Sequence, residues 1–303
     1  MEINGHRIEL SHLDKVLFPD DGITKEQLIR YYSRIAPVIL PHLAGRPLSF
    51  QRFPDGINQE GFYQKNTPDY YPEWIRRIPT ESGDETVNYA AADTTVALIY
   101  FSQQAVITYH PWLSRFDKPL YPDAMVFDLD PGQADFNAVR QAAFDLRQLL
   151  LELDIRSFVK TTGSRGLHVT VPLDRTLNFQ RVKAFAQNVA EVLTGRSPKD
   201  LTTEIRIAKR VGRIFVDTAR NNYGQTAVAP YSIRARPGAP VAVPVTWEEL
   251  GEAELNSSYY NITNVFELLN RRIDPWKDLY TQAQDLTKAL HLIENLKANR
   301  NSR

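Results

Sequence analysis

The chain has 303 residues, of which 43% are hydrophobic and 24% are charged, as in a folded globular protein. It carries 36 Lys and Arg residues against 36 Asp and Glu residues, so binding of phosphate must depend on a local basic patch and not on net charge. The absence of cysteine excludes disulfides and thiolate metal sites, and leaves Asp, Glu and His as metal ligands. There is no long apolar run and no signal-peptide core, which predicts a cytoplasmic protein without a membrane span.

The first helix that the sequence predicts lies in the N-terminal region. Thr24 precedes residues 25–42, whose apolar side chains recur at helical spacing, so Thr24 is the predicted N-cap. Lys15 and Lys25 flank the loop before this helix and could bind an anion near the helix start, although surface lysines are usually only solvated. Residues 47–54 are a predicted strand.

Residues 59–77 interleave aromatic side chains with Lys and Arg and are broken by prolines. Such a surface can stack bases and hold phosphates, but its aromatics could equally fill the core beneath a long loop. Residues 87–109 are predicted to form β-segments, most clearly 96–101 and 105–109. They end at His110, which we expect in a loop.

The region from residue 124 onward has the most regular pattern. Two hairpin strands and two amphipathic helices lie between a first strand and a last strand. The predicted elements are a strand at 125–130, a helix at 136–153, strands at 157–161 and 167–172, a helix at 179–193 ended by Gly195, and a strand at 213–217. This βαββαβ order is that of a ferredoxin-like or RNA-recognition-motif (RRM) fold, an α+β architecture.

Three carboxylates sit at strand ends within this pattern. Asp128 and Asp130 are two residues apart and therefore point to the same side of their strand. Taken alone, Asp-Pro-Gly at 130–132 is ordinary turn chemistry. A third carboxylate, Asp217, at the end of another strand favours a site for Mg²⁺ or Mn²⁺, because turn residues have no reason to meet.

The loop Thr162–Gly166 joins the two hairpin strands. Its Gly and Ser residues are typical of a hairpin turn, but its backbone N–H groups could also form an anion-binding nest. His168 follows this loop and shares a strand face with Thr170. Basic side chains that could balance a triphosphate are Arg165, Arg220, Arg234 and Arg236.

Long motifs of this chain, in this order, resemble the polymerase domain of bacterial and archaeal LigD-type end-joining proteins, in the archaeo-eukaryotic primase superfamily. The motifs are FDLDP at 127–131, TTGSRGLHVTVPL at 161–173, IFVDTARNNYGQTAVAPYSIRARPGAPVAVPVTWEEL at 214–250, LDKVLFPDDGITKEQLIRYY at 13–32 and GFYQKN at 61–66. The resemblance implies one primase-polymerase domain over 1–303, with an N-terminal α/β module at 1–120, an RRM-like catalytic core at 121–260 and C-terminal helices at 261–303.

The resemblance also implies roles for individual residues. Asp128, Asp130 and Asp217 would be the catalytic, metal-binding carboxylates. The nucleotide would contact Thr162, Ser164, Arg165, His168, His110, Arg220 and Arg234. DNA would contact Lys15, Lys25, Phe62, Tyr63 and Lys65. Of these, Lys15 and Lys25 would bind a 5′-phosphate. The chain departs from the family pattern at Thr162, where Ser is usual, at Arg165, where Lys is common, and at His12, where we expect Asn.

The function that the resemblance implies is template-dependent and end-joining addition of NTPs, with ribonucleotides preferred, to a DNA 3′-hydroxyl at gaps and double-strand breaks. It implies two divalent cations, Mn²⁺ or Mg²⁺. The expected partners are DNA with a 5′-phosphate, NTP or dNTP, Ku and an ATP-dependent DNA ligase, in the nucleoid of a prokaryote. The alternatives are a primer-independent primase, a non-catalytic RRM-like binding module and a phosphoesterase. The phosphoesterase has the least support, because the sequence has no His-rich metal cluster.

Overall fold

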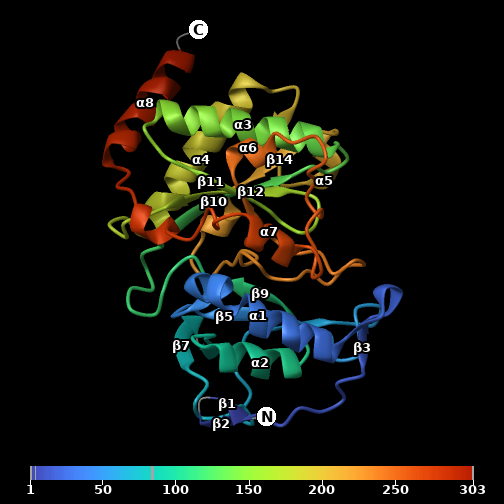
Figure 1. The fold of residues 1–303 in the computed structure, drawn as a ribbon. Helices are drawn as coiled ribbons and strands as arrows, with labels where there is room; N and C mark the ends of the chain where they lie inside the picture. The colour runs from blue at the N-terminus through green and yellow to red at the C-terminus, as the bar shows by residue number, and fades with distance from the viewer. Residues whose placement is uncertain (1, 4, 83–84, 302–303) are drawn as a thin grey trace. The chain divides into compact units, whose positions relative to one another are not determined.

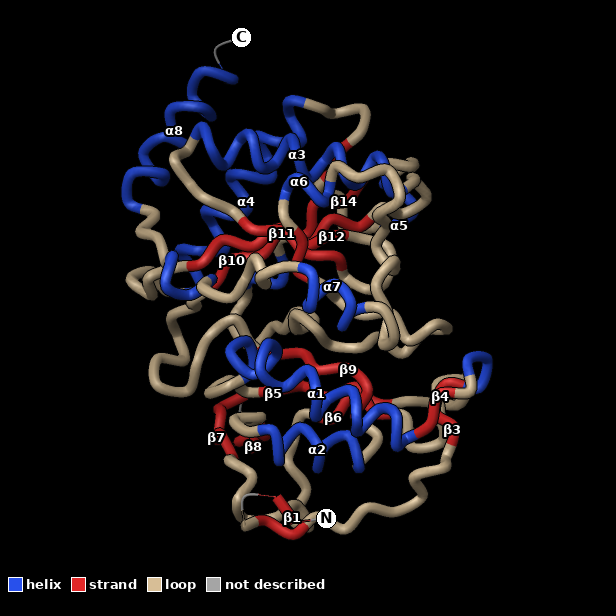
Figure 2. The backbone as a smooth tube through the Cα atoms, in the orientation of Figure 1, coloured by secondary structure: helices blue, strands red, loops and turns tan. Residues whose placement is uncertain are grey.

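The computed structural model describes residues 2–3, 5–82 and 85–301, and the chain divides into two compact units. Unit 1 contains the residues up to Asp117 together with 226–243 and 260–272. Unit 2 contains 118–225, 244–259 and the residues from 273 onward. Each unit has its own sheet and its own helices (Figure 1 and Figure 2).

Unit 1 is built on a five-stranded sheet. Its strand order is β6 (Phe62–Gln64), β5 (Leu48–Arg52), β8 (Glu85–Ala90) and β7 (Arg77–Ser82), and β9 (Val106–Pro111) also pairs with β5. The helices α1 (Lys25–Leu43) and α2 (Thr95–Gln103) pack against each other and against β9. The smaller elements are β1 (Glu2–Ile3), β2 (His6–Arg7), β3 (Val16–Phe18), the 3₁₀ turn η1 (Pro19–Asp21), β4 (Ile23–Thr24) and α7 (Val265–Arg271).

The predicted start of α1 is confirmed. The Thr24 side chain accepts a hydrogen bond from the Gln27 backbone N–H, and the Gln27 side chain accepts one from the Thr24 N–H at 2.8 Å. This capping box satisfies two of the four backbone donors that a helix start leaves unpaired.

Two predictions in unit 1 are wrong. Residues 96–101 form the middle of helix α2, which begins after the N-cap Thr94, and do not form a strand. Every residue from Val96 to Gln103 is buried, so the helix has no polar face, and a short apolar run without a helical period is easily taken for a strand. His110 lies in β9, paired with Ser49 of β5, and is not in a loop.

Unit 2 contains a six-stranded sheet in the order β13 (Leu201–Thr202), β14 (Ile214–Asp217), β10 (Ala124–Asp130), β12 (Leu167–Pro172), β11 (Phe158–Thr161) and β15 (Pro244–Val245). The helices α3 (Phe136–Glu152) and α4 (Phe179–Arg196) pack against each other and against β10. The order β10, α3, β11, β12, α4, β14 with antiparallel neighbours confirms the predicted βαββαβ core.

The predicted end of α4 is wrong, by three residues for the last helical residue and by two for the C-cap. The helix continues through Gly195 to Arg196, and Ser197 is the C-cap, with its N–H bonded to Leu193. Gly195 does not adopt a positive φ, so the helix does not end in the left-handed turn that favours glycine.

The remaining elements of unit 2 are α5 (Ile207–Arg210), η2 (Ala219–Asn221), α6 (Trp247–Leu250), η3 (Leu279–Gln282) and α8 (Thr287–Asn301). Among the described residues, none of the helices has the length and apolar composition needed to cross a membrane.

Candidate active site

Four polar side chains form a row across the sheet of unit 2. Asp217 of β14 lies opposite Asp128 of β10, Asp128 lies opposite His168 of β12, and His168 lies opposite Lys160 of β11. Directly opposed residues of antiparallel strands share a face, so all four belong to the same side of the sheet. The strand register therefore brings the predicted Asp128, His168 and Asp217 together and adds Lys160, which the sequence analysis did not select.

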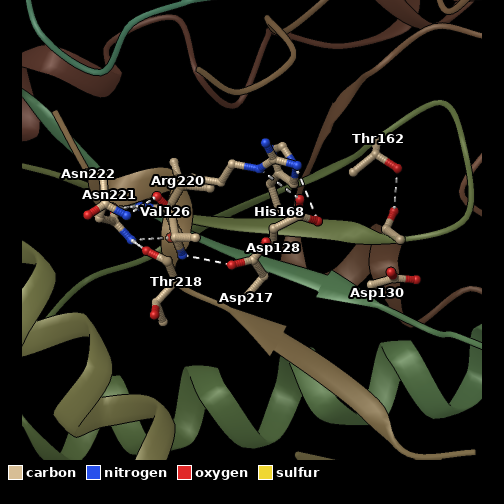
Figure 3. A network of polar contacts seen from close by, with 12 residues as sticks. Val126, Asp128, Asp130, Thr162, His168, Asp217, Thr218, Arg220, Asn221 and Asn222 are labelled. Carbon is tan, nitrogen blue, oxygen red and sulfur yellow. Dashed lines mark hydrogen bonds and ion pairs between the residues drawn. The ribbon is translucent and has the colours of Figure 1, made fainter. Parts of the chain in front are cut away.

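Asp128 is the centre of this row (Figure 3). Its Oδ1 lies 3.4 Å from His168 Nε2, and its Oδ2 accepts a hydrogen bond from Arg220 Nε at 3.3 Å. Burial alone would raise the pKa of Asp128, but His168 and Arg220 beside it hold that pKa well below its usual range. Burial and the nearby Lys160 lower the pKa of His168 to about 4. His168 is then neutral at neutral pH, so Arg220 is the permanent cation that keeps Asp128 ionised.

Arg220 is held above Asp128 by its neighbour Asn221. Asn221 is buried, and its side-chain amide forms hydrogen bonds to both backbone groups of Val126. Its Oδ1 accepts from the Val126 N–H at 2.8 Å, and its Nδ2 donates to the Val126 carbonyl at 2.7 Å. The pairing of β14 with β10 covers residues 128–130 of β10. The Asn221 amide thus replaces a strand neighbour at Val126 and fixes η2 against the sheet, as the dashed lines in Figure 3 show.

The other two carboxylates have partners of their own. Asp217 Oδ1 accepts from the Ala219 N–H at 2.7 Å, and burial, followed by the nearby Asp128, raises the pKa of Asp217. Asp130 accepts from the Gly132 N–H at 3.0 Å and forms an ion pair of 3.2 Å with Arg210.

Basic residues and an aromatic ring complete the surroundings of Asp130. Arg165 lies 3.8 Å from Asp130, and the Arg210 guanidinium lies 3.9 Å from the centre of the Phe215 ring. In Figure 3 Asp130 lies apart from Asp128 and Asp217.

One observation speaks against a divalent-cation site at these carboxylates, and one speaks for it. Within the described ranges, no group of three acidic or imidazole side chains is already arranged around a metal position. However, Asp128 and Asp217 oppose each other in a partly buried place, and their mutual repulsion contributes to the raised pKa of Asp217. Carboxylate oxygens on one surface are the donors that Mg²⁺ and Mn²⁺ prefer, and a cation between them would relieve this repulsion. The donor set therefore fits such ions, provided that the arginine partners of the carboxylates are displaced.

The loop Thr162–Gly166 lies against the end of β10. The hydroxyls of Thr162 and Ser257 both donate to the Gly166 carbonyl, at 3.0 Å and 2.7 Å, so the Thr162 hydroxyl closes the loop. A Cβ atom on Gly166 would lie 2.2 Å from the Leu129 carbonyl oxygen, so only glycine fits this approach. Ser164 is half-buried, and within the described part of the chain its hydroxyl has no hydrogen-bond partner.

The predicted phosphate lysines lie together in unit 1. The Lys25 N–H donates to the Lys15 carbonyl at 2.9 Å, and Lys25 Nζ donates to the Ser11 carbonyl at 3.2 Å. Lys15 Nζ forms an ion pair of 2.6 Å with Asp55. Burial, followed by repulsion from Lys15, lowers the pKa of Lys25. The pair therefore concentrates positive charge at the start of α1, where the helix dipole also favours an anion.

The predicted aromatic pair lies on β6 of the same unit. Phe62 and Tyr63 are adjacent strand residues and so point to opposite faces of the sheet. Phe62 lies beside Arg52, and the Tyr63 ring packs at a tilt against His110, with 5.7 Å between the ring centres. Lys65, one residue beyond β6, is exposed.

Arg234 also belongs to unit 1, in the segment 226–243. Its backbone N–H donates to the Pro240 carbonyl at 2.7 Å. The predicted carboxylates lie in unit 2 and the predicted DNA contacts in unit 1. The predicted nucleotide contacts are divided: His110 and Arg234 belong to unit 1, and the others belong to unit 2.

The sequence analysis missed four residues that shape the site of unit 2, namely Lys160, Arg210, Asn221 and Ser257. Lys160 could have been found by counting back through the hairpin from His168, because the register of a hairpin follows from its loop. Asn221, Arg210 and Ser257 act through contacts between segments distant in sequence, for which the sequence carries no local signal.

The chain is similar in sequence to known end-joining proteins. The sequence profile described as "LigD, primase-polymerase domain" matches residues 24–276. The "Multifunctional non-homologous end joining protein LigD" of Mycolicibacterium smegmatis is 35% identical over 276 residues, which cover 90% of this chain and 35% of that protein. The "Bifunctional non-homologous end joining protein LigD" of Bacillus subtilis is 30% identical over 292 residues, which cover 95% of this chain and 47% of that protein.

A solved structure shows the same fold. The "Polymerase Domain from Mycobacterium tuberculosis Ligase D in complex with DNA" superimposes with a TM-score of 0.87 at 32% sequence identity, covering 92% of this chain and 99% of that one. The chain spans between about a third and a half of the length of the LigD proteins named above. The chain belongs to the LigD primase-polymerase domain family.

Proposed function

We propose that this chain is a nucleotidyltransferase of DNA end joining, which adds nucleotides to a DNA 3′-hydroxyl at gaps and double-strand breaks. The observation that carries the proposal is the in-register row of Asp217, Asp128 and His168 on one face of the βαββαβ sheet. Two facing carboxylates beside arginines suit a reaction in which negative charge gathers on phosphate oxygens.

Asp128, Asp130 and Asp217 would hold two divalent cations, Mg²⁺ or Mn²⁺. When bound, such ions lower the pKa of an attacking hydroxyl and neutralise charge on the leaving pyrophosphate. The chain's own residues would position the nucleotide. Arg220, fixed by Asn221, would contact the triphosphate, and the free hydroxyl of Ser164 would donate to it.

His168 contributes as a neutral group. Its lowered pKa leaves the ring uncharged at neutral pH with a single N–H, so it can donate to a phosphate oxygen once Asp128, 3.4 Å from Nε2, has turned to another partner. Lys160 adds positive charge beside His168. Arg165 at the rim would add a further nucleotide contact within unit 2.

Lys15 and Lys25 would bind a 5′-phosphate on the DNA. The support is their closeness at the N-terminus of α1, together with the similarity of the chain to a mycobacterial polymerase domain whose solved structure is a complex with DNA. Phe62, Tyr63 and Lys65 would contact bases and backbone nearby. Preference for ribonucleotides, and association with Ku and an ATP-dependent DNA ligase, are further parts of the proposal.

The test is extension of a gapped duplex that carries a 5′-phosphate, with NTPs or dNTPs and with Mg²⁺ or Mn²⁺. We expect extension by the wild-type chain, faster with NTPs, and at least about 100-fold slower extension by Asp128→Asn. The matched control is Asp200→Asn, because Asp200 is exposed and is not a member of the row. Equal rates for Asp128→Asn and Asp200→Asn would refute the assignment.

A reaction on single-stranded template without a primer separates polymerase from primase. The proposal predicts no product there. Efficient primer-free synthesis would favour the primase alternative instead.

A further inference from the structure

A pocket of about 540 Å³ lies in unit 1 and is lined by none of the residues predicted to bind the nucleotide, the metal ions or DNA. All its lining residues belong to unit 1. They come from α1 and the loop before it, from α7 and the residues just before that helix, and from the turn at Gly238. Pockets of about 300–1,000 Å³ are typical of small-molecule sites. We call this site the α1–α7 pocket.

Arg34 of α1 and Phe266 of α7 form one wall of the pocket. The Arg34 Cζ lies 3.8 Å from the centre of the Phe266 ring, so the guanidinium is held against the ring. Within the described part of the chain, the Arg34 guanidinium makes no hydrogen bond and no ion pair. A guanidinium stacked on a ring keeps its N–H edges available for a phosphate or a carboxylate. Arg34 is therefore positioned to bind an anion.

Arg30 supplies a second positive charge in the pocket. It precedes Arg34 by four residues on α1, so the two side chains are neighbours on the helix surface. Arg30 Nη2 pairs with Glu26 at 2.9 Å, but both side chains are exposed and such a pair is weak. Like charges at this spacing repel each other, and an anion bound between them would relieve the repulsion.

The charge of the pocket is positive overall. Asp21 is the one acidic residue among the described residues that line it, against Arg30 and Arg34. Asp21 Oδ2 accepts a hydrogen bond from the Gly238 N–H at 2.7 Å, so this carboxylate already has a partner within the fold. The arginines are thus the groups that would select a ligand by charge.

The rest of the pocket is largely apolar. Ile23 and Ile262 line it, together with the ring of Tyr31. The Tyr31 hydroxyl donates to the Tyr231 carbonyl at 2.8 Å, and the Tyr31 ring lies 5.6 Å from the Phe266 ring. Tyr31 therefore offers a ligand its ring and not its hydroxyl. The pocket combines an anion-binding edge with an apolar wall.

We infer that the α1–α7 pocket binds a free nucleoside phosphate, apart from the nucleotide that is transferred. Arg30 and Arg34 hold the phosphate groups, and Ile23 and Ile262 pack against the nucleoside. A nucleoside phosphate fits both parts, because it is charged at one end and carries a flat base at the other. An inorganic phosphate would leave the apolar wall uncovered. The inference goes beyond the proposed function and does not depend on it.

The experiment is photo-crosslinking of the full chain with 8-azido-ATP in EDTA, followed by peptide mapping. EDTA removes the divalent cations that the carboxylate row would need to hold a triphosphate. We expect the label on α1 or on residues 261–266. A label confined to unit 2 would overturn the inference.

The affinity for ATP under the same conditions is measured by isothermal titration calorimetry. Arg34→Ala is expected to bind ATP about tenfold or more weakly, because a charged contact with phosphate is lost. Arg34 is exposed, so its removal leaves the core intact. The matched control is Arg181→Ala, since Arg181 is an exposed arginine of unit 2. Equal affinities of the two variants for ATP would overturn the inference.

Two competitors test the class of ligand. Inorganic triphosphate should bind more weakly than ATP, and a duplex with 5′-hydroxyl ends should not displace ATP. Equal affinity for triphosphate and ATP would leave a plain anion site, and displacement by the duplex would make the pocket a contact for the DNA backbone. Either result would overturn the inference.

Extension of the gapped duplex keeps this site distinct from the site of transfer. Arg34→Ala should have the KM of the wild type for NTP, because the α1–α7 pocket contains no residue of the carboxylate row. A raised KM in this variant would place Arg34 in the transfer site and overturn the inference, while wild-type extension would still uphold the proposed function.

Discussion

The two candidate regions of this chain are built in different ways. In unit 2, Asp217, Asp128 and His168 are placed by strand register, and Asn221 fixes the arginine that faces them. In unit 1, Lys25 is buried, but Lys15 is half-exposed and pairs with an exposed aspartate. A register-built site is expected to fail when one member is removed, because buried partners are left unsatisfied. When one residue of a solvent-exposed site is removed, the expected loss of binding is small.

Outside the carboxylate row, the largest effect that would sharpen this contrast is expected from Asn221→Ala. The change leaves the buried N–H and carbonyl of Val126 without their partner and frees η2. We expect a loss of about 2–4 kcal/mol in the free energy of unfolding, and extension at least about tenfold slower because Arg220 is no longer held. Urea unfolding and single-turnover extension measure the two effects.

The control for this change is the neighbouring Asn222→Ala. Asn222 is only partly buried and makes one local bond to the Ala219 carbonyl. If Asn221→Ala were as stable and as active as Asn222→Ala, the positioning role of Asn221 would be wrong.

The next effect is the pH dependence of stability in the metal-free protein. Because burial and Lys160 lower the pKa of His168 to about 4, from an ordinary value of 6.5, the unfolded chain binds one proton more than the folded chain between these pH values. The free energy of unfolding should therefore fall by on the order of 3 kcal/mol as the pH is lowered from 6.5 to 4. His168→Asn should remove this part of the slope.

The control for the pH experiment is His291→Asn, on the exposed side of α8. An identical slope in wild type and His168→Asn would show that His168 does not stay neutral in the fold.

A smaller effect is expected in unit 1 from Lys15→Ala combined with Lys25→Ala. A phosphate contact by a charged donor contributes about 1.5–3 kcal/mol. The double variant should thus lose about tenfold or more of the preference for a 5′-phosphate over a 5′-hydroxyl, while extension at saturating DNA stays near wild type. Competition binding with the two duplexes measures this preference.

Lys118→Ala is a suitable control, because Lys118 is an exposed lysine of unit 2 that contacts the Arg175 carbonyl. A preference that persists in the double variant would leave Lys15 and Lys25 as ordinary surface residues.

The sequence was sufficient to predict those parts of the site that follow from local rules. Strand alternation places Asp128 and Asp130 on one side, and the βαββαβ order brings β14 beside β10, so the meeting of Asp217 with Asp128 could be expected. Thr24 could be assigned because a capping box is encoded within four residues.

The rest depends on contacts that no local pattern encodes. Helix α2 was mistaken for a strand because it is buried on every side and has no polar face. Asn221 bonds to Val126 across 95 residues, and Ser257 to Gly166 across 91, so their roles appear only in the folded chain. Arg52 contacts both the Tyr70 hydroxyl and the Phe62 ring, and the contact with Tyr70 joins residues 18 positions apart.

The most direct test of the central claim is the rate of single-nucleotide addition by Asp217→Asn during a titration with Mn²⁺, on a gapped duplex with a 5′-phosphate. Asp217 opposes Asp128 in the row, and an amide there keeps the shape but removes one charge. The wild-type rate should rise to saturation with Mn²⁺, whereas Asp217→Asn should remain about 1,000-fold slower at every concentration. A rate for Asp217→Asn within about twofold of wild type, roughly the scatter expected of such rates, would show that the carboxylate row is not the site of nucleotide transfer.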